Sequence, residues 1–186
     1  MGRVYSLIDE SLTKFIQSQH VFFVSTAPLD PAGHLNLSPK GLDSFRVLSP
    51  TTVAYLDLIG SGVETIAHLK ENGRIILMFC AFSGPPNIVR LHGTGRVVEP
   101  GADEFPHLAA QFPNYESTRA IIVVEVTRIA NSCGFGVPLM QYEGDRDHSF
   151  AWAKKKGPQG LAAYKREKNW QSIDGLPGLT ESKLAE

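Results

Sequence analysis

Residues 34–47 read HLNLSPKGLDSFRV, and this stretch decides how the rest of the chain is interpreted. A strand-like alternation through Leu35 and Leu37 is interrupted at 38–41 and resumes at 45–47. Proline cannot donate a ladder hydrogen bond, so Pro39 belongs on a sheet edge or at a bulge, and a neighbouring glycine allows close approach to the backbone. The stretch therefore predicts a broken edge strand that some other group approaches closely.

The rest of the chain predicts an antiparallel β-barrel. Runs rich in apolar and β-branched residues indicate six strands, at 21–27, 35–41, 53–58, 74–82, 87–99 and 119–133. The 74–82 run is continuous enough to predict a strand buried on both faces. Long crossover helices do not alternate regularly with these strands, as a parallel sheet would require. We therefore expect a mainly β (α+β) fold with short flanking helices.

Three short helices are expected around the barrel. Ser6 and Asp9 suggest a capping box for an N-terminal helix, and Ser61 and Glu64 suggest another for a helix over 61–73 that ends at Asn72-Gly73. Residues 105–112 have a third helical pattern.

The C-terminal part has a different character. Residues 134–149 are rich in turn formers, and a helix is expected over 150–168 with a break at 156–160, KGPQG. Trp152, Tyr164 and Trp170 make this part too aromatic for simple disorder. We expect a barrel over 1–133 and an extension over 134–186 that docks on the barrel or on a partner subunit.

Composition excludes several classes of function. The chain has 186 residues, a formal net charge of -1 and a pI near 6.6, so no basic field favours nucleic acid or a membrane surface. Cys80 and Cys133 lack metal-ligand spacing and are expected to be buried free thiols, and no metal site is expected. Neither a signal pattern nor a membrane-spanning run is seen, so a cytoplasmic protein is expected.

An anion site at the start of the 61–73 helix is the main candidate from the residues themselves. Helix amides, hydroxyls of Ser61 and Thr65, and the charge of Lys40 suit a phosphate. The alternative is an ordinary capping box beside a surface lysine. Glu64 supports that alternative, because a first-turn carboxylate satisfies the same amides and repels an anion.

Charged strand residues also bear on this candidate site. Arg90 and Arg96 are further candidates that would offset Glu64, although a solvent-facing strand residue is the simpler interpretation of each. Asp57 is expected to be an exposed acid at the end of a strand, and the alternative is a polar contact.

The order of these segments resembles a known family. NLSPKG at 36–41, VAYLDLIGSG at 53–62, ETIAHLKENGRI at 64–75 and RLHGTGRVVE at 90–99 resemble the pyridoxamine 5'-phosphate oxidase-like split barrels, over about residues 15–130. The resemblance implies a six-stranded split β-barrel that forms a homodimer, with FMN bound at the subunit interface. On that hypothesis, a planar ring lies against the interrupted strand.

The resemblance also implies which residues contact FMN. Asn36, Ser38, Pro39 and Lys40 match the strand whose backbone contacts the flavin ring, and Tyr55 and Leu56 match the next contacting pair. Glu64 and Thr65 stand where the true oxidase has an arginine and a lysine that bind the FMN phosphate, so Ser61, Thr65, Lys40 and Arg90 would have to compensate.

The functional expectation is an FMN-binding flavoprotein with oxidoreductase activity. Its substrate is unknown, a reduced nicotinamide or a small organic molecule would donate electrons, and no side chain is nominated as an acid or base. The chain is not expected to be the true oxidase, because the C-terminal segment NWQSIDGLPGL lacks that enzyme's signature. The alternatives are a binding protein for haem, a deazaflavin or pyridoxal phosphate, and a structural dimer with an empty cleft.

Overall fold

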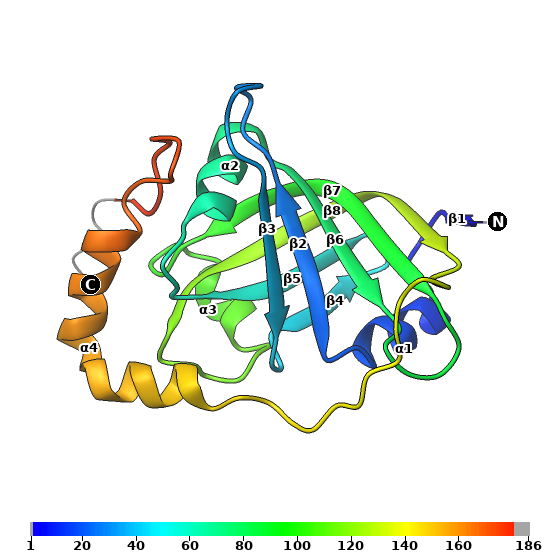
Figure 1. The fold of residues 1–186 in the computed structure, drawn as a ribbon. Helices are drawn as coiled ribbons and strands as arrows, with labels where there is room; N and C mark the ends of the chain where they lie inside the picture. Colours follow the sequence, from blue (N-terminus) through cyan, green and yellow to red (C-terminus); the bar gives the residue numbers. More distant parts are fainter. Residues whose placement is uncertain (1, 181–186) are drawn as a thin grey trace.

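The computed structural model describes residues 2–180 and contains one antiparallel sheet that curves into an open barrel (Figure 1). The hydrogen-bonded order is β3-β2-β6-β7-β8-β5-β4, and β1 pairs with β8. The strands are β1 (Val4–Tyr5), β2 (Val21–Thr26), β3 (Asn36–Gly41), β4 (Phe45–Ser49), β5 (Thr52–Leu58), β6 (Arg74–Cys80), β7 (Ile88–Val98) and β8 (Thr118–Ser132). The predicted mainly β split barrel is confirmed, with eight strands rather than six, because β1 was not expected and the alternation that resumes at 45–47 forms a separate strand, β4.

The sheet packs around a main core and a smaller second cluster, and β5 and β8 are buried on both faces for much of their length. In β2, Phe22, Val24 and Thr26 are buried while the alternate residues are half-exposed. The same alternation holds in β6, so the expectation that this strand is buried on both faces was wrong. Phe22 packs against Phe79 with ring centroids 5.5 Å apart, which joins β2 to β6 inside the barrel.

β3 is an edge strand, as the proline predicted, but it is not broken. Every residue from Asn36 to Gly41 pairs with β2, and Pro39 lies opposite Phe23. The interruption comes after Gly41, where Leu42 has a φ of 61°, a left-handed conformation that non-glycine residues rarely adopt. The expected break at 38–41 is therefore displaced to the turn that leads into β4.

Short helices flank the barrel, although two of their predicted caps were wrong. Helix α1 (Glu10–Gln17) begins after Asp9, whose carboxylate accepts a hydrogen bond from the Leu12 amide at 2.8 Å, so Ser6 is not the cap. Helix α2 (Glu64–Asn72) has Val63 as its N-cap and no side-chain cap, and it ends at Gly73 as predicted. Helix α3 (Phe105–Ala109) is shorter than expected.

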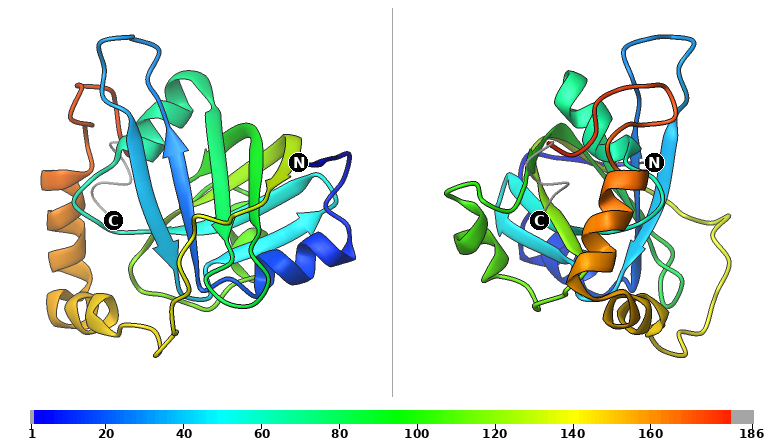
Figure 2. Two further views of the ribbon diagram at one scale, coloured as in Figure 1. Left: turned by 45° about the vertical axis from the view of Figure 1, so that its right-hand side comes forward. Right: turned by 90° about the vertical axis from the view of Figure 1, so that its left-hand side faces the viewer.

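The C-terminal part wraps around the outside of the barrel. From the end of β8 the chain runs below the sheet to helix α4 (His148–Lys168), which stands beside the barrel (Figures 1 and 2). The predicted break in this helix is confirmed by the non-helical Gly157.

Residues 169–180, here called the C-terminal strap, return to α2. The Asn169 side-chain Nδ2 donates to Gly60 O at 2.9 Å, and Lys70 Nζ donates to Gly178 O at 2.6 Å. Leu179 joins the main core. The last part of the predicted extension, 181–186, lies outside the described residues.

Two further observations bear on the sequence predictions. Cys80 is a buried free thiol as expected, but Cys133 is exposed, so that part of the prediction was wrong. Across residues 2–180, no helix combines the length and the apolar content that crossing a membrane requires.

Candidate functional site

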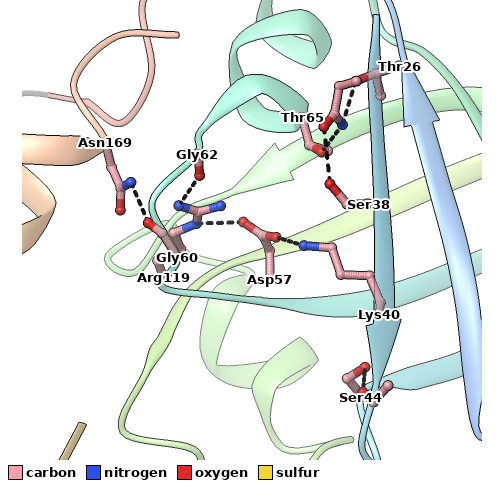
Figure 3. A network of polar contacts seen from close by, with 12 residues as sticks. Thr26, Ser38, Lys40, Ser44, Asp57, Gly60, Gly62, Thr65, Arg119 and Asn169 are labelled. Atoms are coloured by element: carbon pink, nitrogen blue, oxygen red, sulfur yellow. Dashed lines mark hydrogen bonds and ion pairs between the residues drawn. The ribbon is translucent and has the colours of Figure 1, made fainter. Parts of the chain in front are cut away.

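The candidate site lies along the seam where the sheet fails to close, between β3 and the β5–α2 region. Alternation along β3 puts Asn36, Ser38 and Lys40 on one face of the strand, and their side chains bond across the seam or to one another (Figure 3). Lys40 contacts β5 and Asn36 contacts α2. Three of the predicted flavin-contacting residues are therefore neighbours on one strand.

Asp57 is the charged centre of the seam. Its carboxylate is completely buried, 2.8 Å from the Lys40 ammonium and 2.7 Å from Arg119 Nε. Arg119 is fixed in turn by a 2.7 Å hydrogen bond from Nη1 to Gly62 O. The expectation that Asp57 is an exposed acid was wrong, because two cations from different strands enclose it.

The protonation state of Asp57 follows from these neighbours. Burial alone would raise its pKa, but the charges of Arg119 and Lys40, together with their hydrogen bonds, lower it to about 2. Asp57 is therefore ionised near neutral pH, and the Lys40-Asp57-Arg119 triad has two positive charges against one negative charge.

A second, uncharged network continues from Asn36 toward the core. The Asn36 amide donates to Thr65 Oγ1 at 2.9 Å and to Thr26 Oγ1 at 3.2 Å, and Ser38 donates to Asn36 Oδ1 at 3.1 Å. Thr26 Oγ1 lies 2.9 Å from Nδ1 of the buried His68. These contacts tie β2, β3 and α2 together and fix the rotamer of Asn36.

Tyr55, Leu56 and Thr65 are near the seam but buried. Tyr55 has no exposed surface and its ring lies in the main core, whereas Leu56 faces a second apolar cluster with α3. The Tyr55 hydroxyl lies near Thr65, but no partner within residues 2–180 meets hydrogen-bond geometry. Burial raises the pKa of Tyr55 well above its ordinary value, and the negative charge of Asp57 raises it further. Tyr55 is therefore a neutral buried donor.

The start of α2 differs from the predicted anion site. Ser61 is exposed and lies before the N-cap Val63, so the Ser61-Glu64 capping box does not form. Glu64 instead accepts a long hydrogen bond, 3.4 Å, from the Ile173 amide of the C-terminal strap. The strap thus covers this end of the seam.

Arg90 is not part of the seam. It lies on β7, three strands away from β3 in the sheet order, and it donates to Ser132 Oγ at 2.9 Å. The structure therefore brings together Asn36, Ser38 and Lys40 in the seam, leaves Pro39 on the opposite face of β3, and places Arg90 elsewhere.

A cavity of about 750 Å³ adjoins the lower end of β3. Pro39 and Lys40 belong to its wall, so Lys40 contacts both the seam and this cavity. Its volume is within the range of pockets that hold small organic molecules, about 300–1,000 Å³.

Sequence reasoning missed Arg119, Thr26 and His68 as members of the site. Arg119 could have been noticed, because it is a lone charge directly before the apolar run AIIVVEV at 120–126. A charge at that position requires a partner if it is buried. Thr26 and His68 gave no such signal.

Comparison with known proteins agrees with this fold. The family model described as pyridoxamine 5'-phosphate oxidase matches residues 8–133. The pyridoxamine 5'-phosphate oxidase family protein ustO of Aspergillus flavus is 39% identical over 192 residues, covering 94% of this chain and 77% of that protein. The chain therefore belongs to the pyridoxamine 5'-phosphate oxidase family.

Solved structures support the fold. HupZ of Group A Streptococcus superposes with a TM-score of 0.52 at 23% identity, covering 66% of this chain and 91% of HupZ. A candidate pyridoxamine 5'-phosphate oxidase from Lactobacillus delbrueckii superposes with a TM-score of 0.52 at 19% identity, covering 67% of this chain and 94% of that protein.

Proposed function

We propose that this chain binds FMN and acts as a homodimeric oxidoreductase on a small organic substrate. The observation that carries the proposal is the exposed edge of β3. Within residues 2–180 no strand pairs with its outer side, and the strand positions Lys40 beside the seam. Backbone groups that no strand uses must find other partners, and the N–H and C=O groups of a flavin ring are suitable ones. Membership of the family supports the same cofactor.

The seam residues fit a flavin chemically. Asn36 Oδ1 and the Ser38 hydroxyl oxygen have acceptor capacity left on β3, and the Tyr55 hydroxyl, which has no hydrogen-bond partner within residues 2–180, is a buried donor close by. The single net positive charge of the Lys40-Asp57-Arg119 triad suits the phosphate of FMN. The flavin would supply the redox chemistry, and these residues would bind and orient it.

The dimer is supported by apolar side chains on the same edge. Leu35 and Leu37 are 80% and 67% exposed, and an exposed apolar edge strand in a single chain indicates a surface that another chain covers. The division into a barrel, 1–133, and an extension, 134–186, belongs to the same proposal, and the strap contacts with α2 support docking of the extension on the barrel. We also propose that the protein is cytoplasmic.

The proposal is tested by incubating the purified chain with FMN and separating bound from free flavin by gel filtration. We expect flavin absorbance to elute with the protein at the volume of a dimer. Lys40→Met should weaken retention by about tenfold, because it removes one charged contact. Lys14→Met, which removes an exposed lysine paired with Glu10, is the matched control and should change nothing. A wild-type protein that stays colourless would refute FMN binding.

One observation favours a second candidate, a binding protein for another ligand. Glu64 adds a carboxylate at the α2 end of the seam, where it opposes a phosphate dianion. The same gel-filtration experiment with haem, a deazaflavin and pyridoxal phosphate distinguishes the two candidates. Retention of one of these ligands, with FMN passing through, would select the binding protein.

A further inference from the structure

The cavity beside β3 has two walls from distant parts of the sequence. Its floor is formed by β2, β3 and the turn after β3, including Phe23, Pro39 and Leu42. Its roof is the segment 140–146, which passes below the barrel between β8 and α4 (Figure 1). None of the networks in the seam requires this segment, so its position over β3 needs a separate explanation.

The roof is attached to the barrel at two points. The rings of Tyr142 and His20 stack with centroids 3.6 Å apart and an interplanar angle of 4°. The Met140 amide donates to Phe82 O at 2.9 Å. These contacts hold the segment across the cavity, although the segment has no helix or strand of its own.

The walls are mainly apolar and suit a flat molecule. The floor provides hydrocarbon and aromatic surface from Phe23, Pro39 and Leu42. Met140 and Phe82 provide the same kind of surface above and beside it. Leu42 keeps its left-handed φ of 61° at the rim of the cavity. Backbone strain of this kind concentrates where a ligand is held.

The cavity is also lined by an arginine that has no ion-pair partner in the part of the chain that the structure describes. Arg146 lines it and takes part in none of the ion pairs formed within residues 2–180, whereas Lys40 is already paired with Asp57. The neighbouring acid, Asp145, lies near the Tyr142 hydroxyl and raises the pKa of Tyr142. A guanidinium with free donors binds a carboxylate in bidentate fashion.

We propose that this cavity binds a small planar organic anion, an aromatic or conjugated carboxylate. Its flat body lies between the Pro39 surface and the Met140-Tyr142 roof, and its carboxylate pairs with Arg146. Lys40 lies in the cavity wall and in the seam, so the cavity is where the substrate meets the flavin. This last assignment rests on the proposed function, whereas the binding site itself does not.

The test uses naphthoate as the probe and naphthalenemethanol as its neutral analogue, each titrated calorimetrically into the full chain. Naphthoate should bind more tightly than the alcohol. Arg146→Ala should lower the affinity for naphthoate by about tenfold and leave the affinity for the alcohol unchanged. Met140→Ala should lower the affinity for both probes. Arg128→Ala, an exposed arginine of β8 outside the cavity lining, is the matched control.

Two results would overturn the site: no binding of either probe, or equal binding of naphthoate to wild type and Arg146→Ala. Arg146 is exposed, so its replacement leaves the core intact, and circular dichroism of each variant verifies folding.

Repeating the titration with FMN present separates this proposal from the proposed function. Naphthoate binding to both the free and the FMN-saturated protein supports a substrate site. Competitive displacement of naphthoate by FMN would overturn the substrate assignment and make the cavity the cofactor site. If FMN does not bind but naphthoate binding still requires Arg146, the proposed function is refuted and the cavity site is supported.

Discussion

The replacement Asp57→Asn tests the electrostatic account of the seam most directly. It keeps the shape of the side chain but leaves Lys40 and Arg119 without their shared counter-ion. The pKa of Asp57 falls from 3.8 to about 2 on folding, and a difference of that size corresponds to about 2 kcal/mol of stability. Removing one partner from a buried charge cluster costs about 3–5 kcal/mol. We therefore expect a loss of about 3 kcal/mol in the free energy of unfolding.

The assay is urea unfolding followed by the fluorescence of Trp152 and Trp170. The control is Glu104→Gln, which removes an exposed ion pair with Arg96 and should change the free energy by less than about 0.5 kcal/mol. If Asp57→Asn is no more destabilising than Glu104→Gln, the buried triad does not stabilise the seam and the reasoning is refuted.

The pH dependence gives a second check on the same variant. A group whose pKa is lowered by folding stabilises the protein above its unfolded pKa and loses that effect as pH falls through its folded pKa. The stability difference between wild type and Asp57→Asn should thus be constant above pH 3.8 and shrink between 3.8 and about 2. A difference that stays unchanged through this window would contradict the charge assignment.

Two other predictions concern the elements that position the site. Gly73→Ala should destabilise the protein by about 1–2 kcal/mol, because residue 73 has a φ of 71° and a Cβ there would lie 2.9 Å from Thr94 Cγ2. Gly136→Ala, where a Cβ meets nothing within 4 Å, is the control in the same urea titration. Asp174→Asn should loosen the C-terminal strap, because Asp174 accepts hydrogen bonds from the His34 amide at 2.7 Å and from the His34 ring at 2.6 Å. Amide hydrogen exchange should become faster at 170–178 and stay unchanged in β6 and β7, and unchanged exchange at 170–178 would show that this contact does not hold the strap.

The fold was largely predictable because its signals are local. Alternating apolar residues, Pro39 on an edge strand and Gly73 after a helix each depend on the conformation of a few neighbouring residues. The errors at Ser6 and Ser61 are of the opposite kind. Each residue could have capped a helix, but α1 begins after another local cap, Asp9, and α2 begins after Val63 with no side-chain cap.

The site was predictable only in part, because its contacts join residues far apart in the chain. The sequence alone determined that this stretch lies on a sheet edge, because Pro39 cannot donate a ladder hydrogen bond. Only the structure showed that the strand continues through 38–41, so that Asn36, Ser38 and Lys40 share one face. Only the tertiary structure decided that Asp57 is buried between Lys40 and Arg119, because closing the seam brings together residues 17 and 62 positions apart. The same is true of segment 140–146, whose place over β3 depends on the path of the chain around the barrel and on no local pattern.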